Sequence, residues 1–186
     1  MQKLNKMKIT FDSKITLIFS AIAVMAFFIA RSFPDPLSHF FILNGDFQQN
    51  NVVWYISTIG YIFGHADTGH LLGNLAMFLL LAPIIEKKYG SKQFLLMLLI
   101  TAIITAIIHT FFWDNGLLGM SGIVFMLIIL STLVHSKSNE IPLTFLLVLV
   151  LYLGQEILAS FKADNISHFA HLAGGASGIF WAYFKK

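Results

Sequence analysis

The stretch GLLGMSGIVFMLIIL, residues 116–130, places a single serine at the start of a long apolar run. A run of this kind is typical of a buried or membrane-spanning helix. Ser121 lies between Gly119 and Gly122 and has two interpretations. It could cap or pack the helix, since serine is common at both kinds of position. It could also be a nucleophile that works inside a membrane.

The composition indicates a membrane protein. Of 186 residues, 57% are hydrophobic and 11% are charged, which is too apolar for an ordinary soluble domain. The absence of cysteine excludes disulfides, thiol catalysis and thiolate metal sites. Lysine and arginine total 12 against 9 for aspartate and glutamate, an excess too small to indicate nucleic-acid binding. No small-residue cleavage site follows the first apolar segment, so we expect no cleavable signal peptide.

Six apolar runs cover most of the chain, and each is close to the roughly 20 residues that cross a bilayer core as a helix. Helices satisfy every backbone hydrogen bond within the segment. We therefore expect an all-α membrane protein, a six-helix bundle forming a single domain over residues 1–186, with a long outer loop at 32–68. The expected helices cover about residues 12–31, 69–86, 92–112, 117–135, 141–160 and 167–184.

The placement of lysine predicts the orientation of the bundle. With the N-terminus in the cytoplasm, ten lysines lie on the inner side and only Arg31 and Lys162 lie outside. This asymmetry follows the positive-inside rule and predicts that both termini are cytoplasmic. The second, fourth and sixth helices then all begin near the outer face.

The unusual polar residues lie at the beginnings of these three helices. His70 and Asn74 belong to the second helix, Ser121 to the fourth and His171 to the sixth. At about 1.5 Å per residue, His70, Ser121 and His171 fall roughly 3–6 Å from their helix starts. Asn74 is one turn deeper. We therefore expect the four side chains in one layer.

The spacing of His70 and Asn74 suits the binding of negative charge. They are four residues apart and share a helix face. Together with the backbone N–H of Ser121, they could donate hydrogen bonds to an oxyanion. Gly119 and Gly122 leave the serine open to a substrate carbonyl.

Glycines near His171 favour a close helix contact. Gly174 and Gly178 follow His171 at three and seven residues, on the same face, and small residues let another helix approach. A close fourth helix would bring Ser121 within hydrogen-bond reach of His171. A hydroxyl needs a base to become a nucleophile, and the pKa of histidine suits that task near neutral pH.

Several motifs resemble the signature of rhomboid intramembrane serine proteases. They occur in the order of that family, on the second, fourth and sixth expected helices, and the likeness extends from about residue 60 onward. The motifs are HADTGHLLGN (65–74), EKKYGS (86–91), GMSG (119–122) and AHLAGGASG (170–178).

The resemblance implies a rhomboid-like fold and a Ser–His dyad without the acidic third member of the usual triad. Ser121 would be the nucleophile and His171 the general base. His70, Asn74 and the Ser121 amide would form the oxyanion site, and His65 matches a supporting histidine of the family.

The activity implied is that of a serine endopeptidase without metal or cofactor. Its substrates would be single-pass or multi-pass membrane proteins, cut in or near their transmembrane segments. The expected location is the inner membrane of a bacterium, with the active site near the outer face.

Other interpretations remain open. Asn74 could be interhelical glue, and His168 with His171 and either His65 or His70 could bind a metal, although no HExxH motif is present. A catalytically inactive rhomboid-like protein would bind membrane proteins without cutting them. A small transporter would need charged sites in mid-membrane, and Glu156 is the main candidate.

Overall fold

The computed structural model describes residues 11–33, 35, 37–134, 136, 140–154 and 168–184. Within this part of the chain the structure is helical and has no β-strand, which confirms the all-α class. The elements are α1 (Lys14–Ser32), η1 (Leu37–Phe41), α2 (Val52–Gly60), η2 (Tyr61–Phe63), α3 (Thr68–Tyr89), α4 (Ser91–Phe112), α5 (Ser121–Leu133), α6 (Leu143–Val148), the π-helical η3 (Leu149–Leu153) and α8 (His168–Phe184).

Three of the described helices, α1, α3 and α4, are long and apolar enough to cross a membrane. With 19, 22 and 22 residues they are about 29–33 Å long, which matches a hydrocarbon core of about 30 Å. Helices α5 and α8 have 13 and 17 residues and are shorter than that core. Residues 155–160 of the fifth expected helix lie outside the described residues, so the six-span arrangement stays a prediction.

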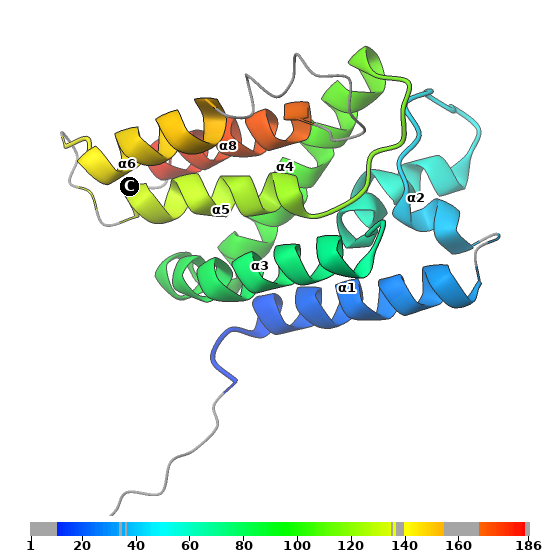
Figure 1. The fold of residues 1–186 in the computed structure, drawn as a ribbon, viewed down its shortest axis with the longest axis horizontal. Helices are drawn as coiled ribbons and strands as arrows, with labels where there is room; N and C mark the ends of the chain where they lie inside the picture. Colours follow the sequence, from blue (N-terminus) through cyan, green and yellow to red (C-terminus); the bar gives the residue numbers. More distant parts are fainter. Residues whose placement is uncertain are drawn as a thin grey trace, which may run out of the picture.

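The helices lie roughly side by side (Figure 1), in the order α1, α3, α5 and α8. Helix α4 crosses this row and contacts all four. Helices α3, α5 and α8 begin at the same end of the molecule, where α2 also lies. This arrangement brings the first turns of three helices into one layer.

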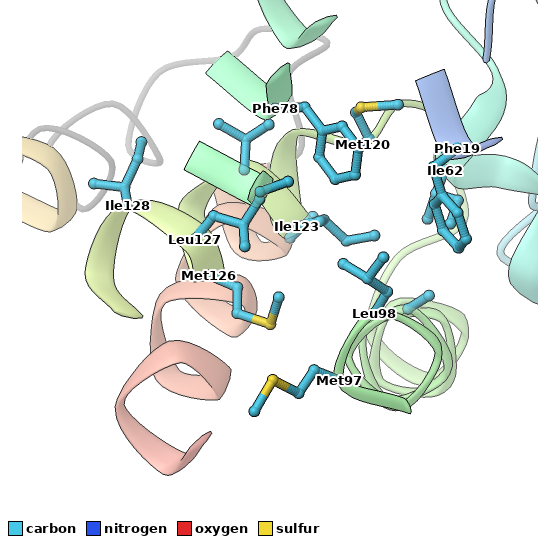
Figure 2. Close-up of a cluster of buried hydrophobic side chains, with 14 of the residues drawn as sticks. Phe19, Ile62, Phe78, Met97, Leu98, Met120, Ile123, Met126, Leu127 and Ile128 are labelled. Carbon is cyan, nitrogen blue, oxygen red and sulfur yellow. The ribbon is translucent and has the colours of Figure 1, made fainter. Parts of the chain in front are cut away.

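Helix α5 is the centre of the bundle. Seven of its apolar residues between positions 123 and 130 are buried, and a helix that is apolar on all sides is expected inside its neighbours. Figure 2 shows this core, in which side chains of α5 lie near those of α3 and α4. The labelled residues are Phe19, Ile62, Phe78, Met97, Leu98, Met120, Ile123, Met126, Leu127 and Ile128.

Helix α5 begins at Ser121 rather than at residue 117, the start of the fourth expected helix. Leu117 instead exchanges two backbone hydrogen bonds with Leu43, at 2.8 and 2.9 Å, and Gly119 N–H donates to the carbonyl of Tyr61 at 2.8 Å. These bonds hold residues 117–119 outside the helix. Ser121 therefore lies in the first turn.

The expected loop at 32–68 contains more structure than the sequence predicted. It includes α2, which begins at Val52 because the Asn51 side chain accepts a hydrogen bond from Val53 N–H at 2.9 Å. The bonds of Leu43 with Leu117 and of Tyr61 with Gly119 tie this region to the segment before Ser121.

At the opposite end, Glu86 joins three helices. Its carboxylate accepts hydrogen bonds from the backbone N–H groups of Ile15 and Thr16, each at 2.9 Å, and from the hydroxyls of Thr16 and Ser91, at 2.8 and 2.6 Å. Glu86 thus caps α1 and links it to the end of α3 and the start of α4. The side chain is 2% exposed, so these bonds satisfy a buried charge.

Helices α5 and α8 cross at glycines. A Cβ added to Gly174 would overlap the carbonyl oxygen of Gly122, and one added to Gly122 would lie 2.9 Å from the carbonyl oxygen of Ala170. A Cβ on Gly178 would lie 2.6 Å from the carbonyl oxygen of Met126. The two backbones are therefore in direct contact.

This contact makes Gly174→Ala a strongly destabilising substitution. We expect a loss of about 1–3 kcal/mol of unfolding free energy, because overpacked sites must move backbone or side chains. Gly73→Ala in α3 is the matched control, since an added Cβ there has nothing within 4 Å. The control should be neutral or slightly stabilising. Reversible unfolding in mixed detergent measures both, and equal stability of the two variants would contradict a backbone contact at Gly174.

Candidate active site

Asp67 sets the start of α3. Its carboxylate accepts a hydrogen bond from His70 N–H at 2.8 Å, which is the usual capping arrangement at a helix N-terminus. That bond holds the pKa of Asp67 below its ordinary value. The capping residue places His70 in the first turn and Asn74 one turn deeper, as their spacing predicted.

Ser121 and His171 are brought together by the crossing of α5 and α8. Ser121 Oγ lies 2.8 Å from His171 Nε2, within hydrogen-bond distance, and both side chains are partly buried. They are separated by 50 residues in the chain. The close approach at Gly122 and Gly174 accounts for the short distance, because larger residues there would separate the two helices.

Phe125 holds the ring of His171. The two rings stack with centroids 4.4 Å apart and an angle of 2° between their planes. His168 belongs to the same helix as His171, and its ring lies edge-on to the His171 ring with centroids 6.4 Å apart. Phe125 was not predicted from the sequence as part of the site. It follows Ser121 by four residues, and this spacing puts it on the same helix face as the serine.

His70 and Asn74 both face Gly119. This glycine has a φ of +111°, a conformation that side-chain-bearing residues rarely adopt. A Cβ added to Gly119 would lie 2.8 Å from His70 Nε2 and 3.9 Å from Asn74 Nδ2. The Asn74 amide donates one hydrogen bond to the carbonyl of His70 at 3.1 Å, and a primary amide carries a second N–H.

A cavity of about 530 Å³ joins these groups. This volume is in the range of small-molecule sites and accommodates a short length of extended chain. Its walls combine the candidate residues with small residues and leucines. The lining residues are Ala66, Asp67, Gly69, His70, Gly73, Asn74, Gly116, Leu117, Leu118, Ser121 and His171.

His65 lies behind His70, just before α3. Its Nδ1–H donates to the carbonyl of Phe63 at 3.1 Å, and its ring meets that of His70 edge-on with centroids 5.0 Å apart. Burial lowers the pKa of His65 to about 4. The ring is therefore neutral at neutral pH and supports His70 without adding charge.

The described residues contain no group of three or more His, Asp or Glu side chains arranged to hold a metal ion. Glu156, the candidate charged residue of the fifth expected helix, lies outside the described residues. His168 is buried in α8 and does not line the cavity.

Comparison with known families identifies the family of the chain. The model of the rhomboid domain matches residues 50–186, well over half of the chain. The chain belongs to the rhomboid family. The family and the apolar helices together make this rhomboid an integral membrane protein, and the motif resemblance is confirmed.

Two relatives extend the comparison. This rhomboid is 24% identical to the Rhomboid protease GlpG of Haemophilus influenzae over 178 residues, covering 92% of the chain and 91% of the relative. It is 31% identical to Rhomboid-related protein 1 of Caenorhabditis elegans over 134 residues, covering 66% of the chain. That match spans only 38% of the nematode protein.

The low pKa of His65 predicts a pH-dependent loss of stability. Between the ordinary pKa of 6.5 and about 4, the unfolded chain binds a proton that the folded ring does not bind. Stability therefore falls as the pH is lowered through this window. Because the ring is only partly buried, we expect the unfolding free energy to fall by roughly 1–2 kcal/mol, which is less than the full effect of the pKa difference.

The measurement compares unfolding of the wild type and His65→Gln in detergent between pH 7.5 and 4.5. Glutamine is neutral throughout and keeps an N–H donor for Phe63. The wild type should lose more stability than the variant on acidification, whereas parallel curves would mean that His65 is solvated and titrates normally.

Proposed function

We propose that this rhomboid is an intramembrane serine endopeptidase that hydrolyses peptide bonds in or near transmembrane segments of membrane proteins. The observation that carries the proposal is the 2.8 Å contact between Ser121 Oγ and His171 Nε2 beside a cavity. A serine paired with a histidine in this way has the arrangement required of an activated nucleophile.

In the proposed reaction, the Ser121 hydroxyl donates its proton to His171 Nε2 while Oγ attacks the substrate carbonyl carbon. The tetrahedral intermediate collapses, the C–N bond breaks, and His171 gives the proton to the leaving amine. A water molecule then hydrolyses the acyl-enzyme with His171 again as base. Stacking on Phe125 keeps the imidazole plane fixed through these steps.

Negative charge would develop on the substrate carbonyl oxygen next to Gly119. We assign its stabilisation to the backbone N–H of Ser121, the ring of His70 and the second N–H of Asn74. The contacts of His70 and Asn74 with the Gly119 position support this assignment. Gly119 contributes by leaving space where any side chain would meet His70.

The substrate class follows from the surroundings of the site. The cavity is lined by residues at the starts of α3, α5 and α8, and these three helices begin at the same end of the bundle (Figure 1). We place that end close to one membrane face. A substrate helix must unwind locally there, because a helical carbonyl is already hydrogen-bonded. The lysine asymmetry supports cytoplasmic termini and an active site near the outer face. The resemblance to the Haemophilus protein supports a bacterial inner membrane.

The paired side chains also favour an enzyme over an inactive rhomboid-like binding protein. A protein that only bound transmembrane segments would not require a serine and a histidine at hydrogen-bond distance beside a cavity. It would also not require an aromatic ring stacked on that histidine. A transporter would be expected to have broken helices, whereas α3, α4 and α5 are continuous.

If Ser121 and His171 act as one unit, each alanine variant should lose roughly 10³-fold or more in kcat, and the double variant should lose no more than the worse single one. The measurement is cleavage of transmembrane test substrates in liposomes, together with labelling by a fluorophosphonate probe that reacts with activated serines. Probe labelling requires no knowledge of the natural substrate.

Ser177→Ala is the matched serine control. Ser177 lies on α8 and donates to the carbonyl of Ala173 in its own helix. This variant should cleave and label like the wild type. Losses that multiply in the Ser121/His171 double variant would show independent roles and reject the dyad.

The oxyanion assignment predicts an order among Asn74 variants. Asn74→Ala should lower kcat and kcat/KM together, by up to about 10²-fold. Asn74→Asp should be worse, because an ionised carboxylate repels an oxyanion, and the ratio of the two rates should approach one as the pH falls and the carboxylate is protonated. Asn74 is 7% exposed, so stability is measured separately. Wild-type rates in both folded variants would make Asn74 purely structural.

A further inference from the structure

A second recess lies at the opposite end of α3 from the cavity that contains Ser121. It has a volume of about 630 Å³ and is formed where α3 ends at Tyr89 and α4 begins after Gly90. His70 and Tyr89 are 19 positions apart on one helix, about 28 Å along its axis. This recess, the α3–α4 groove, is therefore separate from the proposed catalytic site.

The groove combines one cation with a leucine surface. Lys92, Leu95, Leu96 and Leu99 line it, and their spacing of three, four and seven residues puts them on one face of α4. Lys92 is exposed and Leu96 is 46% exposed. From the N-terminus of α4, Lys92 comes first, and the leucines follow over about 10 Å toward the membrane interior.

Exposed lysines gather at the end of α3 and the start of α4. Lys87, Lys88 and Lys92 are exposed, and none makes a salt bridge within the part of the chain that the structure describes. Glu86 is the only acidic residue between Asp67 and Asp114, and α1 and Ser91 occupy its carboxylate. The groove therefore lies in a field that attracts anions.

Two further groups offer hydrogen bonds to an anion. The Gln93 side chain lines the groove, and its Nε2 is buried without an acceptor among the described residues. The start of α4 has no side-chain cap, so its first N–H groups add partial positive charge beside Lys92. These donors lie near Lys92 and could bind the same anion.

We propose that the α3–α4 groove binds one anionic glycerophospholipid, with its phosphate at Lys92 and an acyl chain along Leu95, Leu96 and Leu99. The order of charge followed by apolar surface matches the order of a phospholipid from headgroup to chain. Free phosphate lacks the apolar part and leaves the leucines uncovered. Helices α3 and α4 are both candidate membrane spans, so their junction lies at the depth of lipid headgroups.

The test is a lipid titration of the delipidated full-length protein, followed by native mass spectrometry. Phosphatidylglycerol and phosphatidylcholine are the probes. We expect the first phosphatidylglycerol to bind at least about fivefold more tightly than phosphatidylcholine, as a lysine at the membrane surface contributes roughly that factor. Lys92→Gln should weaken phosphatidylglycerol binding by about fivefold, and Lys92→Arg should retain it.

Lys88→Gln is the matched control, because it removes one nearby exposed charge that does not line the groove. It should weaken the first binding event by less than about twofold, since screened surface charges contribute little. Leu96→Gln tests the chain-binding wall, because it removes the apolar side chain without placing a charge one turn from Lys92, and it should weaken the binding of both lipids.

Three results would overturn the proposal. Equal binding of the two lipids would remove the charge selectivity. Equal losses in Lys92→Gln and Lys88→Gln would show a general surface-charge effect. Displacement of phosphatidylglycerol by millimolar inorganic phosphate, with Leu96→Gln behaving as wild type, would identify a simple anion site. Thermal unfolding of each variant confirms that it is folded.

Discussion

The contact between α5 and α8 at Gly122 and Gly174 is the constraint on which the candidate site depends. Neither position has room for a Cβ, so the two backbones approach more closely than helices with ordinary side chains can. Ser121 is next to one of these glycines, and His171 is three residues before the other. Their 2.8 Å contact is thus a direct consequence of backbone packing.

A second constraint acts on the segment before Ser121. Leu117 pairs with Leu43, and Gly119 bonds to Tyr61, so the chain enters α5 abruptly. This keeps the serine in the first turn, where its N–H has no partner within the helix. The same segment carries Gly119, whose positive φ brings the backbone against His70. Loop pairing and helix packing therefore build one site from opposite sides.

Polar groups in an apolar bundle must be satisfied internally, and the two ends of α3 do this differently. At its start, Asp67 caps the helix and His70 meets the cavity. At its end, the Glu86 carboxylate takes hydrogen bonds from α1 and α4. The end that contains His70 opens into a cavity lined in part by small residues. At the other end, the hydrogen bonds of Glu86 hold α1, α3 and α4 together.

The sequence alone determined the helical class and the membrane setting and predicted the residues of the candidate site, because these depend on local composition and spacing. Helical periodicity puts His70 near Asn74 and aligns Gly174 with His171. The tertiary structure decided what depends on distant segments: the late start of α5, the helix α2 within the expected loop, and the stacking of Phe125 on His171. The late start of α5 and the stacking of Phe125 result from pairing or packing between parts of the chain that no local pattern relates.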